Sequence, residues 1–140
     1  MLKAFTTLNG KLKEVQIEHV GKELETRTKN YFWIDATEPN VSELHELSKI
    51  AKIPIEDLNM CLDEEERPRI EQTEGYQLII YRAPYVHREK SDIEILTSPI
   101  GIFLTKECTI TVHLHHTRYL EDVVERGVPV DAPPAFTSRV

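Results

Sequence analysis

The sequence contains no hydrophobic run long enough to cross a membrane. Its longest stretch without a charged residue is the eleven residues 95–105, and this stretch includes Pro99 and Gly101. A membrane-spanning helix needs about twenty mostly apolar residues. The N-terminus also has no apolar segment of the kind found in signal peptides. We therefore expect a soluble, intracellular chain.

Cysteine is scarce, because the 140 residues include only Cys61 and Cys108. Two cysteines are too few for a disulfide-supported fold, which agrees with a reducing compartment. The sequence also has no Gly-x-Ser-x-Gly elbow, no glycine-rich phosphate loop and no Cys-x-x-Cys pair. Buried, unreactive thiols are the simpler interpretation, since Cys108 adjoins a predicted strand. We expect that the protein is not an enzyme.

Positive charge is in the minority, with 17 Lys and Arg against 24 Asp and Glu and a net charge of −7. Nucleic-acid binding depends on clustered Lys and Arg, so we expect no nucleic-acid partner. The composition suits weak contacts with divalent cations better. Hydrophobic residues make up 40% of the chain, which is enough for a folded core in a single domain.

Local patterns predict a series of strands and helices. Asn9-Gly10 is a strong hairpin signal between strands at 2–8 and 12–18. Asn40 followed by Glu43 predicts a capping box that opens a helix over 41–52. The other predicted elements are a strand at 31–35, a helix opened by Pro54, strands at 70, 78–81, 100–104 and 110–114 with a turn at 105–108, and a last helix from Thr117 to Gly127.

The strand at 78–81 is apolar on both of its faces, which predicts cover on both sides, most simply by helices. The predicted fold class is therefore α/β or α+β, with a mixed β-sheet between helical layers. We expect one domain over 1–126. Residues 127–140 contain three prolines and no periodicity, so they are predicted to form an irregular tail.

Three histidines at the end of the predicted strand 110–114 form one candidate metal site. His113 and His115 would point to the same face of a strand, about 7 Å apart, and His116 follows. Two imidazoles can share a transition-metal ion, although a tight site needs a third ligand. The alternative is a polar strand end that leaves the sheet.

Acidic residues form a second candidate. The run at 63–66 is typical of a solvated surface that Arg67 and Arg69 partly neutralise. Glu56 and Asp57 differ, because they project outward from the first turn of the helix that follows Pro54. The helix dipole favours carboxylates there, and Mg²⁺ is commonly bound by one or two carboxylates with retained water. Spacing alone leaves both explanations open.

Four segments, in the same order along the chain, resemble signatures of the CorA-type magnesium and cobalt transporters. The match extends from about Tyr31 to Arg126. The segments are FWIDATEP at 32–39, IPIEDL at 53–58 with EEERPRIE at 64–71, FLTKECTITVH at 103–113, and VVER at 123–126. The family strings that they resemble are WIDLTDP, HPLxLEDxL…xQRPKVE, LTKNxLITVH and VRER.

The resemblance implies the N-terminal domain of such a transporter, on the cytoplasmic side of the membrane. In the family a stalk helix and two membrane helices follow, with a Gly-Met-Asn motif at the pore mouth. None of these features occurs in this sequence, so we expect that the chain as given does not conduct ions. We also expect that it stops near the start of the stalk, at Val140.

The resemblance further implies a homopentamer that transports Mg²⁺ or Co²⁺ and is gated by intracellular Mg²⁺. The regulatory ion lies between subunits, held by a carboxylate of this domain and one of a neighbour's stalk. Asp57 matches the first of these positions, with Glu56 as an auxiliary ligand. Two alternatives stay open: a zinc-transporting relative, which the His113 and His115 pair would suit, and a stand-alone metal-binding or interaction module.

Overall fold

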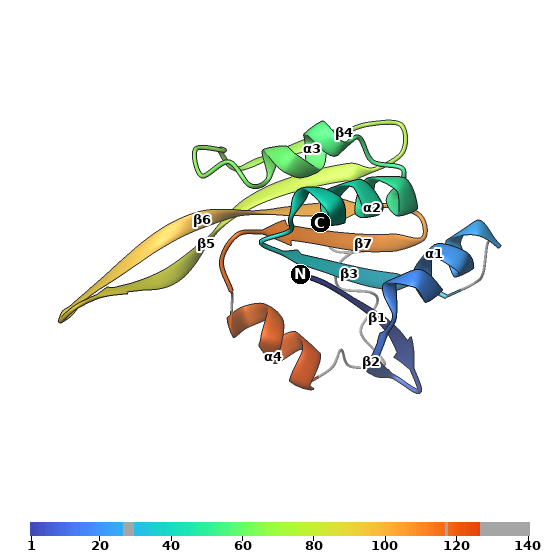
Figure 1. The fold of residues 1–140 in the computed structure, drawn as a ribbon, viewed down its shortest axis with the longest axis horizontal. Helices are drawn as coiled ribbons and strands as arrows, with labels where there is room; N and C mark the ends of the chain where they lie inside the picture. The colour runs from blue at the N-terminus through green and yellow to red at the C-terminus, as the bar shows by residue number, and fades with distance from the viewer. Residues whose placement is uncertain (27–29, 117, 127–140) are drawn as a thin grey trace.

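The structure, a computed structural model, describes residues 1–26, 30–116 and 118–126. Its strands form one mixed sheet in the order β2-β1-β3-β7-β6-β5-β4, in which β3 and β7 are parallel and the other neighbours antiparallel. The strands are β1 (Leu2–Leu8), β2 (Lys11–Val15), β3 (Phe32–Thr37), β4 (Arg69–Gln72), β5 (Gln77–Glu89), β6 (Asp92–Leu104) and β7 (Cys108–His113). The helices are α1 (Ile17–Glu25), α2 (Val41–Ala51), α3 (Ile55–Met60) and α4 (Arg118–Arg126). The predicted fold class is confirmed in its α+β form (Figure 1).

Helices lie on both faces of the sheet. On one face, Ile34 of β3 belongs to the same buried core as Leu47 of α2 and Leu58 of α3. α4 lies on the opposite side, where Leu120 and Trp33 line a common cavity (Figure 1). The predicted arrangement of a mixed sheet between helical layers is therefore present.

Several local signals in the sequence form the structures that they predict. Asn9 and Gly10 both have positive φ, 52° and 77°, as a tight hairpin turn requires. The Asn40 Oδ1 accepts from the Glu43 N–H at 2.8 Å, while the Glu43 carboxylate accepts from the Asn40 N–H at 3.0 Å. α3 begins at Ile55, and Pro54 is its N-cap, not its first helical residue as predicted.

The predicted strand at 12–18 is wrong in its second half. β2 ends at Val15, and α1 begins at Ile17. Val20 is fully buried, and Ile17 and Leu24 pack against the same core. Spacings of three and four residues place these side chains on one side of a helix, so burial against the sheet selects the helix over a longer hairpin.

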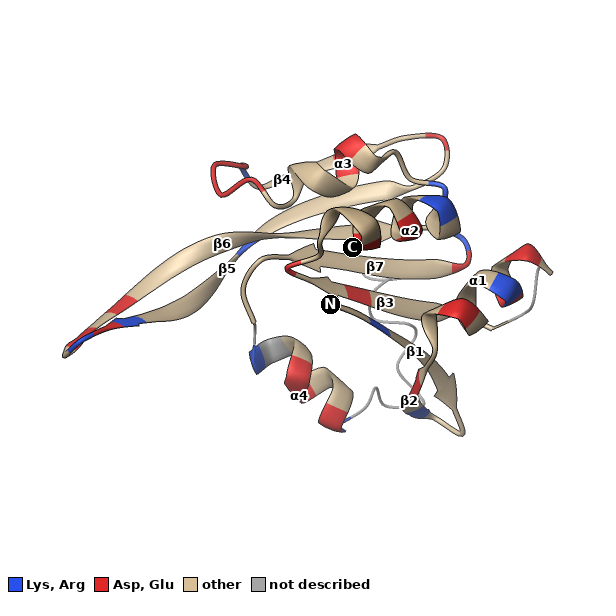
Figure 2. Cartoon of the chain, viewed as in Figure 1, with Lys and Arg blue, Asp and Glu red and all other residues tan. Residues whose placement is uncertain are grey.

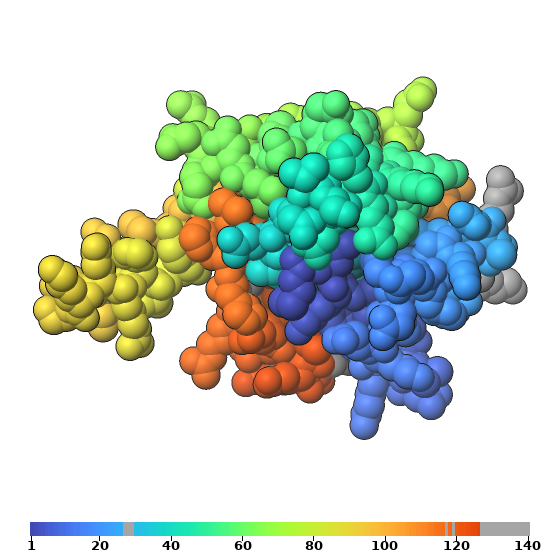
Figure 3. Space-filling view, viewed as in Figure 1, coloured from blue at the N-terminus to red at the C-terminus, as the bar shows by residue number. Residues whose placement is uncertain are grey.

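β5 and β6 extend well beyond their predicted ranges. Their ladder continues from Tyr81 opposite Ile100 to Glu89 opposite Asp92, which forms an arm of residues 82–99 that projects from the body of the molecule (Figures 1 and 3). The arm is held by backbone pairing and buries little apolar surface, so no hydrophobic pattern marks it. The prediction that both faces of 78–81 are covered is also wrong, because Tyr81 is 55% exposed.

The last predicted helix is confirmed as α4, and VVER at 123–126 lies in its second half. Thr117, Gly127 and the predicted tail at 127–140 lie outside the described residues. None of the helices in the described ranges has the length and apolar character needed to cross a bilayer.

Candidate functional site

Gly101 sets the position of α3 on the sheet. Leu58 and Cys61 at this helix are fully buried, and Cys61 lies directly over Gly101 of β6. A Cβ atom at Gly101 would lie 2.0 Å from the Cys61 Sγ, a separation that no packing allows. The missing side chain therefore lets α3 approach the sheet closely. The first turn of α3, with Glu56 and Asp57, is fixed as a result.

Asp57 is half-buried and hydrogen-bonded. In contrast to the prediction, its side chain does not project freely into solvent. The Tyr76 hydroxyl donates to Oδ2 of its carboxylate. The Asp57 backbone is held as well, because its N–H donates to the Pro54 carbonyl at 3.0 Å and its carbonyl accepts from the Cys61 Sγ at 3.5 Å. The carboxylate thus has a defined direction. Glu56, its neighbour, is exposed.

Tyr76 is anchored in the core beside Asp57. Its residue surface is 9% exposed, and its ring centroid lies 5.6 Å from that of Phe103 at an interplanar angle of 57°. Burial raises the pKa of Tyr76 to about 12, with a further contribution from the hydrogen bond and charge of Asp57. The phenol therefore stays protonated and remains a hydrogen-bond donor at physiological pH.

The acidic loop at 63–66 follows α3 (Figure 2). Arg69 contacts two carboxylates, that of Glu66 at 2.5 Å and that of Glu71 at 2.7 Å. Arg82 donates to the backbone carbonyls of Glu64 and Glu66, each at 2.9 Å. The prediction that a neighbouring arginine partly neutralises this run is confirmed for Arg69. These contacts with Arg69 and Arg82 hold the loop in place on the surface of the domain.

His113 forms a buried ion pair with Asp35 across the parallel β3–β7 strands. Its Nε2 lies 2.7 Å from the Asp35 Oδ1, and its side chain is 2% exposed. Its Nδ1 lies 2.6 Å from the His115 carbonyl oxygen, which can only accept, so Nδ1 carries a proton. Burial lowers the pKa of His113, but the hydrogen bond and charge of Asp35 outweigh it and raise this pKa above its usual value.

Asp35 accepts additional hydrogen bonds from the same sheet face. The Thr111 hydroxyl donates to Oδ1 at 2.6 Å, and the Thr37 hydroxyl donates to Oδ2 at 2.8 Å. Trp33 extends the network, because its indole N–H donates to the Thr111 hydroxyl at 3.0 Å. Burial raises the pKa of Asp35, but the contacts with His113 and these hydroxyls outweigh it and lower this pKa.

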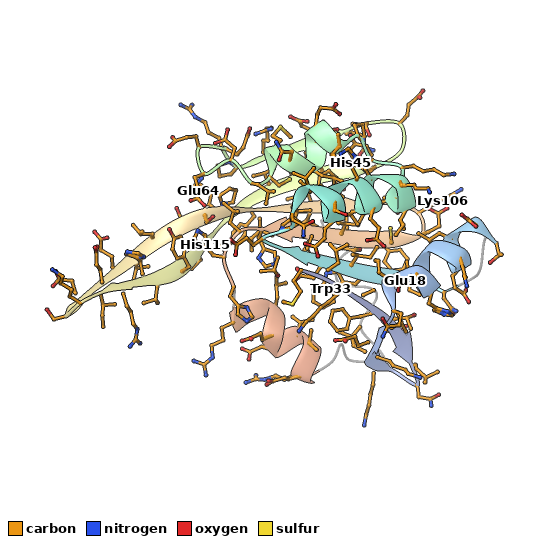
Figure 4. All side chains as sticks on the ribbon, in the orientation of Figure 1. Glu18, Trp33, His45, Glu64, Lys106 and His115 are labelled. Atoms are coloured by element: carbon orange, nitrogen blue, oxygen red, sulfur yellow. The ribbon has the colours of Figure 1, made fainter. Side chains whose placement is uncertain are left out.

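His115 and His116, the other two histidines of the candidate metal site, contact different partners. His115 lies beyond the end of β7, stacks on Tyr85 at 3.9 Å and contacts the Glu64 carboxylate at 3.1 Å (Figure 4). His116 contacts Glu121 of α4 at 2.8 Å. The structure thus does not bring His113, His115 and His116 together. Across the described ranges, no three His, Cys, Asp or Glu side chains gather as a metal site.

Cys61 and Cys108 are both buried and free. Burial raises the pKa of the Cys61 thiol to about 12 and that of the Cys108 thiol to about 11. A thiol reacts as its thiolate, so both side chains are poor nucleophiles at neutral pH. Their placement fits the predicted role as core residues.

Tyr76, Asp35 and Gly101 were not predicted from the sequence as site residues. Tyr76 is 19 residues from Asp57, and Asp35 is 78 residues from His113. No local spacing reveals such partners. One signal was present, since Asp35 stands in the middle of an otherwise apolar strand, where a carboxylate needs a buried partner.

Comparisons with known proteins agree with the fold and with the matching segments. The family model described as CorA-like Mg²⁺ transporter protein matches residues 28–129. Over 81 residues the chain is 40% identical to the cobalt/magnesium transport protein CorA of Methanocaldococcus jannaschii, a match that covers 58% of this chain and 24% of that protein. The chain thus spans about a quarter of this curated relative.

Two solved structures share the fold. The soluble domain of CorA from Methanocaldococcus jannaschii has a TM-score of 0.67 at 27% identity, over 94% of this chain and 49% of that one. The cytoplasmic domain of ZntB from Vibrio parahaemolyticus has a TM-score of 0.62 at 13% identity, over 88% of this chain and 47% of that one. The second likeness shows the fold alone.

Proposed function

Because the chain belongs to the CorA-like Mg²⁺ transporter family, a family of ion transporters, we propose that it is the regulatory, metal-sensing domain of a Mg²⁺ and Co²⁺ channel. In the full-length protein this domain lies on the cytoplasmic side of the membrane, in a homopentamer. Mg²⁺ is then both the transported ion and the ligand that controls gating.

The placement of Asp57 is the observation that carries the proposal. The chain presents a carboxylate at the first turn of α3, held by Tyr76 and next to the exposed Glu56. The same residue stands in the segment that resembles the family signature. Asp57 supplies half of a site, and a carboxylate of a neighbouring subunit completes it, with Glu56 as an auxiliary ligand.

Regulation follows from electrostatics. Two carboxylates that face each other across a subunit boundary repel unless a divalent cation lies between them. An occupied site therefore holds subunits in the closed arrangement. When intracellular Mg²⁺ falls, the site empties, repulsion returns and the open arrangement gains population.

The test compares Asp57→Asn with the wild type in the full-length transporter, by limited proteolysis over a MgCl₂ titration. The amide keeps the shape but removes the charge that binds Mg²⁺ and the repulsion in the empty site. We expect the variant to resist proteolysis without Mg²⁺ and to gain little protection when Mg²⁺ is added.

Asp92→Asn at the tip of the arm is the matched control, because it makes the same chemical change at an exposed position. This control should retain the Mg²⁺ response of the wild type. Equal Mg²⁺ protection of the wild type and Asp57→Asn would refute the proposal, and Asp57 would then be a helix-terminus carboxylate stabilised by the helix dipole.

A further inference from the structure

The sheet has two open strand edges, one on β2 and one on the arm. β2 is the last strand in the sheet order, and among the described residues no strand pairs with its outer edge. β6 pairs with β7 only over Ile100–Leu104, so residues 92–96 of the arm are open on the side away from β5. Open edges present backbone N–H and C=O groups that can pair with another strand. The arm and β2 lie at opposite ends of the molecule, so these two edges cannot meet within one copy (Figure 1).

β2 directs the backbone groups of Leu12 to its open edge. Leu8 and Lys11 flank the two-residue turn at 9–10 and lie opposite each other, as the hydrogen-bonded pair that closes such a hairpin. Hydrogen-bonded and non-hydrogen-bonded pairs alternate along an antiparallel ladder. The N–H and C=O of Leu12, the next residue, therefore point away from β1.

The arm directs the backbone groups of Ile93 to its own open edge. Pro99 lies opposite Arg82, and Pro84 lies opposite Thr97. Proline has no N–H to donate, so both pairs occupy the non-hydrogen-bonded positions of the β5–β6 ladder. Ile93 has the same phase in the strand as Thr97 and Pro99. Its N–H and C=O therefore point away from β5.

The two edges carry matching apolar side chains and opposite charges. Leu12 lies between two exposed lysines, whereas Ile93, which is 66% exposed, lies between two exposed carboxylates. These four charged residues are Lys11, Lys13, Asp92 and Glu94. Within the ranges that the structure describes, none of the four forms an ion pair. Their charges are thus available to a partner.

One antiparallel register between two copies satisfies both the backbone and the side chains. With Leu12 opposite Ile93, their outward N–H and C=O groups form a hydrogen-bonded pair, and each lysine lies opposite one carboxylate. The three pairs are Leu12–Ile93, Lys11–Glu94 and Lys13–Asp92. β2 and β6 run in opposite directions within one copy, so copies in the same orientation meet in this antiparallel sense.

We propose that the β6 edge of the arm pairs with the β2 edge of a second copy of this chain. The contact is head-to-tail, because each copy offers its arm to one neighbour and its β2 edge to another. Such a short ladder is weak between free copies and gains strength where an assembly holds neighbours close together. The inference goes beyond the proposed function and involves no metal ion.

Cysteine cross-linking of the 140-residue chain tests this pairing. Leu12→Cys and Ile93→Cys are made as separate variants, mixed in equal amounts and oxidised, and the covalent dimers are identified by mass spectrometry. Directly opposite Cβ atoms in an antiparallel pair lie about 4.5–5.5 Å apart, close enough for a disulfide after small adjustments. The native Cys61 and Cys108 are buried and do not compete.

Val41→Cys mixed with Ile93→Cys is the matched control, because Val41 is an exposed apolar residue on α2, away from both edges. We expect the mixture of Leu12→Cys and Ile93→Cys to give about fivefold more mixed dimer than this control. Adding Glu94→Lys to the Ile93→Cys chain should lower the yield about fivefold, since it places like charges opposite each other.

A charge exchange separates pairing from folding. Adding Lys11→Glu to the Leu12→Cys chain should restore the yield with the Glu94→Lys partner, which a folding defect could not do. Asp92→Asn keeps all backbone bonds and the Lys11–Glu94 pair, and one exposed pair is weak. It should therefore leave the contact, and any response to Mg²⁺, in place.

Three results would overturn the inference. The first is an equal yield of mixed dimer in the Val41→Cys control. The second is an equal yield of dimer from Ile93→Cys alone, which would show that two arms pair with each other. The third is a yield that Lys11→Glu does not restore, which would exclude the proposed register. None of these results bears on Asp57, so the proposed function is tested separately.

Discussion

Asp35→Asn should destabilise the domain through the buried His113. The two side chains are 13% and 2% exposed and 2.7 Å apart, so solvent screens the pair poorly. Removing one partner of a buried ion pair leaves an uncompensated charge and typically costs about 3–5 kcal/mol. We expect a loss of up to this size in the free energy of unfolding at pH 6, where the wild-type imidazolium has its counter-charge and the buried His113 of the variant must give up its proton.

The pH dependence of stability should change sign in this variant. In the wild type the pKa of His113 is raised, so its contribution is full below the ordinary value of 6.5 and is lost as pH rises through the raised pKa. The pKa of Asp35 is lowered, so its contribution is full above 3.8 and is lost as pH falls through the lowered pKa. Without the Asp35 charge, burial, which lowers the pKa of His113, exceeds the effect of the His115 carbonyl, which raises it. The stability of Asp35→Asn should therefore rise with pH up to the ordinary value of 6.5 and then level off.

Urea unfolding at pH 6 and pH 9 tests this prediction. The chain has one tryptophan, and the Trp33 indole donates to Thr111, which also bonds Asp35, so its fluorescence reports on the same network. The difference between wild type and Asp35→Asn should be larger at pH 6 than at pH 9. Asp92→Asn, an exposed control, should change stability by about 0.5 kcal/mol or less. If the free energy of unfolding had the same pH dependence in the wild type and in Asp35→Asn, the pair would not be ionised.

Two further outcomes are expected. Gly101→Ala should destabilise the domain by about 1–3 kcal/mol in thermal unfolding, because its Cβ would collide with Cys61 and displace α3. An unchanged midpoint would show that α3 does not need this close approach. The 140-residue chain alone should be monomeric or weakly associated in analytical ultracentrifugation, since a charge of −7 on each copy opposes association. A stable pentamer at micromolar concentration without metal would contradict this expectation.

Short-range signals in the sequence were sufficient for much of the fold. The Asn9-Gly10 turn and the Asn40–Glu43 capping box act over two to four residues, so their structures follow from local chemistry. α1 was missed because Ile17 also fits the alternation of the preceding strand. The arm was missed because backbone pairing, which leaves no pattern of burial, holds residues 82–99.

The candidate site was only partly predictable. The position of Asp57 followed from the resemblance of its segment to a family signature, not from spacing. Its link to Tyr76 and the contact of Cys61 with Gly101 join residues from different elements, so only the tertiary fold reveals them. His113 was predicted as a metal ligand, whereas in the structure it pairs with Asp35. The expected shared orientation with His115 depended on a strand that ends at His113.

Binding of the regulatory ion by Asp57 can be observed by anomalous diffraction from crystals of the full-length transporter grown with Co²⁺. Co²⁺, one of the two ions of the proposed channel, can be located by its own scattering. We predict a cobalt peak beside the Asp57 carboxylate, between two subunits, and its loss in Asp57→Asn. Cobalt bound at His113, His115 or His116 and none at Asp57 would contradict it.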